Sequence, residues 1–113
     1  MKLLYEKEKP IYEMANIRPD ETNLPMVIWI FPKTGKEKHS ARIKVSKKYG
    51  EKASDDMFTI TIPDYEIIGD TGNIKKQDIE KVIAFVKLNE QVILQVWEDK
   101  ISPAKAVSLF KKL

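Results

Sequence analysis

Residues 26–31 read Met-Val-Ile-Trp-Ile-Phe, and residues 39–46 read His-Ser-Ala-Arg-Ile-Lys-Val-Ser. The first stretch is apolar at every position, which predicts a strand buried on both faces. The second stretch alternates between apolar and polar side chains, which predicts a strand with one buried and one cationic face. Its apolar set is Ala41, Ile43 and Val45, and its polar set is Arg42, Lys44 and Ser46. The two strands locate a sheet core and a face that is open to a partner.

The bounds of the cationic strand and of the strand that follows it are also predicted. A turn at residues 32–35 leads to the cationic strand, which we place at 38–49. Residues 57–62 form the next strand, with Phe58, Ile60 and Ile62 facing inward and Thr59 and Thr61 facing outward. Pro63 lacks an N–H donor and marks a bulge or an edge, beyond which residues 65–68 continue the same strand.

The N-terminal part has weaker patterns. Residues 11–14 suit a short strand, and residues 18–25 are predicted as a loop because proline disfavours a helical conformation in the residue before it. Residues 1–14 form an N-terminal extension or a short edge element. Residues 15–113 form a single domain, because a chain of 113 residues can bury one sizeable core.

The last 40 or so residues change to a helical period. Two apolar stripes recur at helical spacing, formed by Ile79, Val82, Ile83 and Val86, and by Val92, Ile93, Val96 and Trp97. Asn89 lies between the stripes, where it either caps a second helix or sits inside one long helix. Ser102 followed by Pro103 is typical of a helix start and opens a last helix.

Strands followed by helices predict an α+β fold. We expect a small antiparallel sheet of three to four strands, followed by two or three C-terminal helices packed on one face. The helices would cover one side of strand 26–31, and the chain termini or a second subunit would cover the other side.

The composition narrows the chemistry. The absence of cysteine excludes disulfides and thiolate catalysis. No stretch approaches the roughly 20 apolar residues of a membrane helix, and the apolar part of the N-terminus is too short for a signal peptide. We therefore expect a cytoplasmic protein that does not bind membranes.

Positive charge is concentrated between residues 33 and 52. Eight Lys or Arg residues oppose Glu37 and Glu51 there, a local charge of +6, whereas the whole chain carries +3. Such asymmetry is typical of an anion-binding face, although a solvated lysine-rich surface has the same composition. Arg18 and Arg42 are the only arginines, and nucleic-acid sites usually rely on arginine.

Catalytic motifs are scarce. His39 is the only histidine, which excludes paired-histidine metal sites, and no phosphate-binding loop or nucleophile elbow is present. Asp64, Glu66 and Asp70 are close in sequence and could bind a hard cation through oxygen ligands. A metal-dependent hydrolase is therefore a third hypothesis, while our leading reading requires no cofactor.

The leading hypothesis is a non-enzymatic binding or regulatory module. It binds an acidic protein surface, or a copy of the same chain, through the cationic strand face. A nucleic-acid-binding regulator that uses the same face is the main alternative. The candidate binding residues are His39, Arg42, Lys44, Lys47, Lys48 and Tyr49.

Two blocks of the chain resemble known sequences. The first comprises Ile17-Arg-Pro19, Thr22-x-Leu-Pro-Met-x-Ile-Trp-Ile30 and His39-x-x-Arg-Ile-Lys-Val45, and is similar to a set of small uncharacterised bacterial proteins. The second resembles the C-terminal half of a domain family of unknown function, family forty-one-sixty. Its residues are Gly72-x-Ile74, Asp78-Ile79, Phe85-Val86, Leu88-Asn89 and Trp97.

The resemblance implies a binding or regulatory accessory protein, because members of that family are often encoded near toxin–antitoxin or mobile-element genes. It favours a helix break at Asn89. The family commonly has a second histidine in the region where this chain has Arg42 and Lys44. A metal or acid–base role built on paired histidines therefore does not carry over.

Overall fold

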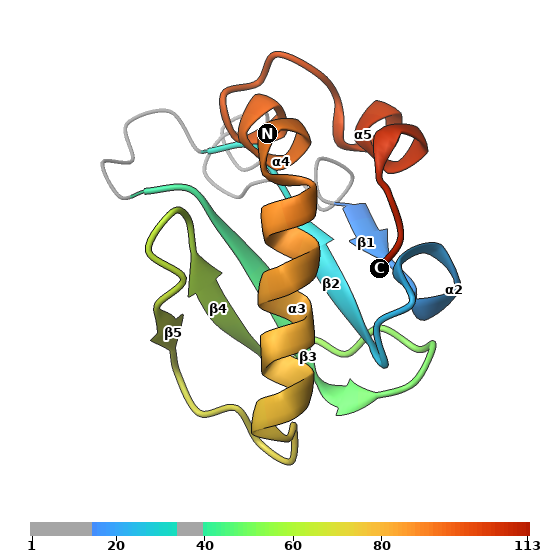
Figure 1. The fold of residues 1–113 in the computed structure, drawn as a ribbon, viewed down its shortest axis with the longest axis vertical. Helices are drawn as coiled ribbons and strands as arrows, with labels where there is room; N and C mark the ends of the chain where they lie inside the picture. Colours follow the sequence, from blue (N-terminus) through green and yellow to red (C-terminus); the bar gives the residue numbers. More distant parts are fainter. Residues whose placement is uncertain (1–14, 34–39) are drawn as a thin grey trace, which may run out of the picture.

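Five antiparallel strands form one sheet in the computed structural model, which describes residues 15–33 and 40–113. The strands are β1 (Ala15–Ile17), β2 (Met26–Ile30), β3 (Arg42–Tyr49), β4 (Met57–Thr61) and β5 (Ile67–Ile68). They lie side by side in chain order (Figure 1). The predicted α+β fold with an antiparallel sheet is confirmed, but the described residues form five strands instead of three or four.

Helices follow the sheet in the sequence, as predicted. They are α3 (Lys76–Leu88), α4 (Glu90–Trp97) and α5 (Pro103–Leu109), and a one-turn helix, α2 (Pro19–Thr22), lies between β1 and β2. Helix α3 runs along the sheet, and α4 and α5 lie toward one end of it (Figure 1). The sheet therefore has a helix-covered face and an opposite face, which we call the outer face.

The helix-covered face holds the apolar side chains that the alternation predicted. Ile43 and Val45 of β3 and Phe58 and Ile60 of β4 are buried in one cluster with side chains from the helices. The helix members of this cluster are Ile79, Val82, Phe85, Val86, Ile93, Val96, Trp97 and Ala106. Removing this apolar surface from water is the main favourable contribution to folding.

Strand β2 is buried on both sides for nearly its whole length. Ile28 and Ile30 belong to the cluster on the helix side, whereas Val27 is fully buried without belonging to it. Because side chains alternate along a strand, Val27 and Trp29 point to the outer face. Trp29 is only partly buried there, which departs from the predicted burial on both faces.

The chain reverses after β4, so the prediction that residues 65–68 continue that strand is wrong. Residues 62–64 form a turn, and Tyr65 has a left-handed backbone with φ of 58°. Strand β5 returns antiparallel to β4, with Ile67 opposite Ile60. A proline fits a turn as well as a bulge, and alternation alone does not distinguish the two.

Residues 18–25, predicted as a loop, contain α2, and Ala15–Ile17 form a strand that was not predicted. Pro19 occupies the first turn of α2, where a missing N–H leaves no hydrogen bond unmade. The Arg18 N–H donates to Glu21 Oε1 at 3.0 Å and closes the helix start. The proline rule constrains Arg18, which is extended, and does not constrain the residues after Pro19.

Helices α3 and α4 are separated at Asn89, as the resemblance favoured. The Asn89 side chain caps neither helix start. Its amide donates to the carbonyls of Phe85 at 3.1 Å and Lys111 at 2.9 Å, and its Oδ1 accepts from the Lys111 N–H at 2.8 Å. The side chain therefore holds the C-terminal segment against the helix junction.

The last helix begins and ends at defined contacts. Ser102 Oγ accepts from the Lys105 N–H at 3.1 Å, which confirms the predicted helix start. Beyond the helix, the Leu113 N–H donates to the Thr22 carbonyl at 3.1 Å, and the Asn23 amide donates to the Leu113 carbonyl at 3.0 Å. These bonds tie the end of the chain to α2.

Some predictions lie outside the described residues. They are the extension or edge element at 1–14, the strand at 11–14 within it, and part of the turn at 32–35. Each of them stays a prediction. In residues 15–33 and 40–113, no helix combines the length and apolar character that crossing a membrane requires.

Replacing Asn89 tests how strongly the C-terminal segment is held. We expect Asn89→Ala to lower the free energy of unfolding by about 1–3 kcal/mol, because the backbone N–H and the carbonyl of Lys111 both lose their hydrogen bond to the Asn89 side chain. Urea unfolding followed by circular dichroism measures the change. Asn73→Ala, at an exposed turn residue, is the control. Equal stability of the two variants would contradict this role.

Trp97 anchors the chain that follows β2. It is 4% exposed, its ring lies 6.0 Å from the Phe31 ring in an edge-on arrangement, and its carbonyl accepts from the Lys33 N–H at 3.0 Å. We expect Trp97→Ala to cost about 3–5 kcal/mol of unfolding free energy, as truncation of a buried aromatic side chain does. Trp97→Phe should lower the free energy of unfolding by less in the same urea titration. A similar decrease for both variants would show that the buried volume of the ring does not account for the stability that Trp97 contributes.

Candidate binding site

The outer face carries a row of residues paired across all five strands. Asn16 lies opposite Trp29, Trp29 opposite Lys44, Lys44 opposite Thr59, and Thr59 opposite Ile68. Side chains directly opposite each other have Cβ atoms about 4.5–5.5 Å apart. The row therefore places a large aromatic ring beside a cation in the middle of the sheet.

Three of the six predicted binding residues, Arg42, Lys44 and Lys48, share this face. Lys44 Nζ donates to Thr59 Oγ1 at 3.3 Å, and Arg42 Nε donates to the Ser40 carbonyl at 3.3 Å. Among the described residues, ion pairs within 4.0 Å are made by other lysines and not by these three cations. The three charges are therefore not neutralised by a described carboxylate.

Lys47 and Tyr49 point to the helix side, so the six predicted residues do not form one surface. The alternation that places Lys48 on the outer face places its two neighbours on the other. Lys47 Nζ lies 3.3 Å from Asp56 Oδ1, and its side chain packs beside Gly72, where an added Cβ would lie 3.2 Å from it. The ion pair and the packing give Lys47 a structural role at this end of the sheet.

The Tyr49 hydroxyl joins the end of β3 to the start of α3. It donates to Asp78 Oδ2 at 2.6 Å and accepts from the Lys75 N–H at 2.9 Å. The hydrogen bond to Asp78 raises the pKa of Tyr49, because ionisation would place two negative charges side by side. The hydroxyl is thus occupied by a structural contact, although the side chain is 42% exposed.

The acidic residues of the hydrolase hypothesis are not assembled into a site. In the described parts of the chain, no three His, Cys, Asp or Glu side chains are grouped so that they could hold a metal ion. Asp70 Oδ1 instead accepts from the Gly72 N–H at 3.0 Å and shapes a turn. His39 lies outside the described residues, so its role as an anion contact stays a prediction.

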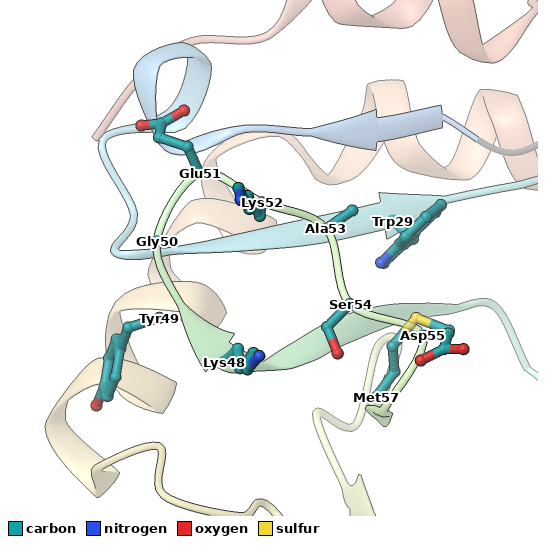
Figure 2. Close-up of a pocket in the computed structure, with 10 residues that line it drawn as sticks. All are labelled: Trp29, Lys48, Tyr49, Gly50, Glu51, Lys52, Ala53, Ser54, Asp55 and Met57. Atoms are coloured by element: carbon teal, nitrogen blue, oxygen red, sulfur yellow. The ribbon is translucent and has the colours of Figure 1, made fainter.

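A cavity of about 950 Å³ lies on the outer face, and one of the three cations, Lys48, lines it. The loop of residues 50–55, which connects β3 to β4, forms one side, and Trp29 of β2 forms another (Figure 2). Tyr49 also borders the cavity, but its ring points away toward α3 (Figure 2). The lining residues are Trp29, Lys48, Tyr49, Gly50, Glu51, Lys52, Ala53, Ser54, Asp55 and Met57.

Both ends of this loop are held by hydrogen bonds. The Gly50 N–H donates to the Pro25 carbonyl at 2.8 Å, and the Lys47 N–H donates to the Asp56 carbonyl at 3.0 Å. Gly50 has a φ of +110°, a conformation that glycine adopts without strain. These anchors position the loop over the outer face, while the side chains of residues 51–53 are exposed.

Trp29 contributes an unusual polar atom to the site. Its indole Nε1 is buried and has no hydrogen-bond partner among residues 15–33 and 40–113. A buried donor without an acceptor is costly and uncommon in folded proteins. The Oγ of Ser54, another residue of the lining, accepts from the Asp56 N–H at 3.1 Å and not from Nε1.

The charged residues of the lining are not evenly placed. Figure 2 shows Glu51 with its carboxylate directed away from Trp29, and Asp55 next to Met57. Lys48 belongs to the same strand and face as Arg42 and Lys44. The side of the cavity toward β3 is therefore positively charged.

The sequence did not predict that Trp29 and the loop of residues 50–55 line this cavity. Trp29 was expected to be buried, because it lies in a continuous apolar run. The signal was present in its position: Trp29 alternates with the core residues Ile28 and Ile30, and so shares a face with the polar side chains of β3. The contribution of the loop follows from its path in space, which the pattern of residues does not indicate.

Comparisons with known proteins give no further guidance. No protein-family model, no curated protein and no solved structure matches the chain. The resemblance to family forty-one-sixty therefore stays a prediction. The function must be inferred from the chemistry of the site.

Removing the Tyr49 hydroxyl tests its hydrogen bond to Asp78, which holds this residue on the helix side of the sheet. We expect Tyr49→Phe to lower the urea midpoint of unfolding at neutral pH, because the neutral phenol stabilises the folded state. That contribution is present below the ordinary pKa of 10.0 and is lost as the pH rises through the higher pKa of the folded protein.

An ultraviolet titration of the tyrosines checks the same assignment. Tyr49→Phe should remove one phenol that ionises late. Tyr65→Phe is the control and should remove a different phenol, since burial and a hydrogen bond to Glu90 raise the pKa of Tyr65 to about 12. A Tyr49→Phe protein with unchanged midpoint and unchanged titration would exclude the proposed contact.

Proposed function

We propose that this protein is a non-enzymatic binding module that recognises an acidic segment of a protein partner on the outer face of its sheet. The observation that carries the proposal is the position of Arg42, Lys44 and Lys48. They lie on one face of β3 without an ion pair to a described carboxylate, and Lys48 lines a cavity of about 950 Å³. Charge on a rigid strand next to a concave surface favours recognition of a complementary anionic surface.

The neighbouring residues favour a short acidic segment over a broad negative surface. The three cations belong to one strand, and the loop of residues 50–55 passes beside Lys48 (Figure 2). A peptide can follow the groove between strand and loop, whereas a flat surface would meet the loop first. This geometry resembles that of other modules in which pockets beside an ordered sheet select a peptide.

Nucleic-acid binding by the same face is the weaker alternative. Lys47, one of the predicted cations, is paired with Asp56 and faces the helix side. The outer face offers one arginine, Arg42, for the bidentate contacts that nucleic-acid sites commonly use.

A cytoplasmic regulatory role fits this binding activity. A link to toxin–antitoxin or mobile-element systems is part of the proposal only through the resemblance of the two sequence blocks. The alternative protein partner is a second copy of the chain.

Selection from a random peptide library displayed on phage tests the proposal without knowledge of the partner. The target is the wild-type protein, and the counter-target is the triple variant Arg42→Glu, Lys44→Glu, Lys48→Glu. We expect enrichment of peptides rich in Asp and Glu. Their affinity for the triple variant should fall by about tenfold or more, as expected when close charge contacts are reversed.

The matched control is Lys76→Glu, Lys100→Glu, Lys105→Glu, which changes the net charge equally at exposed residues outside the sheet. It should keep the wild-type affinity. Because Lys44 also bonds to Thr59, the double variant Arg42→Glu, Lys48→Glu is tested in parallel, with melting temperatures measured for all proteins. The proposal would be overturned if the control and test variants lost peptide affinity equally, or if the selected peptides were not enriched in Asp and Glu.

A binding titration with single-stranded oligonucleotides decides the alternative. Phosphate contacts make the affinity fall with salt, with a log–log slope of about −0.7 per phosphate neutralised on a single strand. Oligonucleotide binding that is tighter than that of the selected peptides at physiological salt, and lost in the triple variant, would favour the nucleic-acid reading.

A further inference from the structure

We infer that the cavity on the outer face is an anchor pocket for one large apolar side chain of the acidic segment, and that an oxygen of the segment accepts a hydrogen bond from Trp29 Nε1. The inference rests on the proposed function and deepens it. It specifies the partner as an acidic peptide with an aromatic or long aliphatic anchor residue, and it assigns Trp29 as the residue that orients this anchor.

The lining of the cavity suits such an anchor, and its size leaves room for neighbouring residues of the segment as well. Its volume of about 950 Å³ lies in the range of roughly 300–1,000 Å³ that small-ligand pockets occupy. Trp29, Ala53 and Met57 supply apolar surface from β2, the loop and β4 (Figure 2). Methionine adapts its shape and makes favourable contacts with aromatic rings, so Met57 can accommodate more than one kind of anchor.

The unpaired Trp29 Nε1 points to a ligand that brings an acceptor. The atom is buried without a partner among the described residues, and the Ser54 hydroxyl beside the cavity is already bonded to the loop backbone. A carboxylate or a backbone carbonyl of the bound segment would satisfy the indole N–H. Neither a purely apolar ligand nor a cation could do so.

The loop of residues 50–55 supplies the means of access. Because less than 1 Å² of Nε1 is exposed, an incoming acceptor reaches it only when neighbouring atoms move, and we infer that the loop, which lines the cavity, is the segment that moves. The loop is bonded to the rest of the chain at Gly50 and Asp56, and Gly50 has open space around its Cα. Opening between these two anchors leaves β3 and β4 in place.

The charges around the pocket orient the segment. Lys48 lines the cavity, and Lys44 and Arg42 continue along the same face of β3. The loop carries Lys52 together with Glu51 and Asp55, so it offers no net positive charge. Acidic residues next to the anchor would therefore lie along β3 and not along the loop.

The test uses 4-phenylbutyrate as the probe, with 4-phenylbutylamine as the matched cation. Two-dimensional NMR of the ¹⁵N-labelled protein reports the indole N–H signals of Trp29 and Trp97 separately. Trp97, whose ring packs on Phe31 in the core, serves as the internal reference. Trp29→Phe identifies the Trp29 signal by its disappearance, and Trp97→Phe does so for the other if the first variant does not fold.

We expect 4-phenylbutyrate to shift the Trp29 indole signal in a saturable way and to leave the Trp97 signal unchanged. The amine should produce no saturable shift, and Lys48→Gln should weaken the binding of the carboxylate. For peptides selected on the wild-type protein, Trp29→Phe keeps an apolar surface but removes the donor, so affinity should fall by about tenfold, as for loss of a central contact.

The outcomes separate the two proposals. If selected peptides bind through Arg42, Lys44 and Lys48 while the Trp29 signal stays unmoved by both peptide and probe, the anchor pocket is excluded and the proposed function stands. The same holds if the amine shifts the signal as much as the carboxylate. If no acidic peptide is selected and the probe does not bind, both proposals are overturned.

Discussion

The structure depends on the burial of strand β2 from both sides. On the helix side, Ile28 and Ile30 join the core, and on the outer face Val27 is fully buried. Strands β1 and β3 pair with its two edges. A strand with neighbours in every direction has to be apolar along its whole length, since any polar side chain there would lose its hydration. The continuous run from Met26 to Phe31 is the consequence of that position.

The candidate site follows from this central strand. Trp29 is the side chain of β2 that extends beyond the buried zone on the outer face, and it does so opposite Lys44 of β3. The loop of residues 50–55 leaves from the end of β3 and encloses the space beside the ring (Figure 2). Apolar surface, cationic charge and an unpaired donor are thus brought together by three segments that are separate in the sequence.

Polar groups on the two faces of the sheet differ in their contacts, and we propose that the outer face serves recognition. On the helix side, polar side chains bond to other groups of the protein. Tyr49 donates a hydrogen bond to Asp78, and Lys47 forms an ion pair with Asp56. Asn89 bonds to the C-terminal segment. On the outer face, Arg42 and Lys44 are bonded only to neutral oxygens among the described residues. This difference is why the site is assigned to the outer face.

The sequence by itself determined the fold class, the alternation of β3 and β4, the helical stripes and the start of α5, because each of these is set by a local period or cap. It placed Arg42 and Lys44 on a shared face for the same reason. Only the tertiary structure decided that residues 65–68 turn back as β5, that Lys47 and Tyr49 serve the helix side, and that Trp29 lines a cavity. These features depend on which distant residues approach one another, and a local pattern carries no information about such contacts.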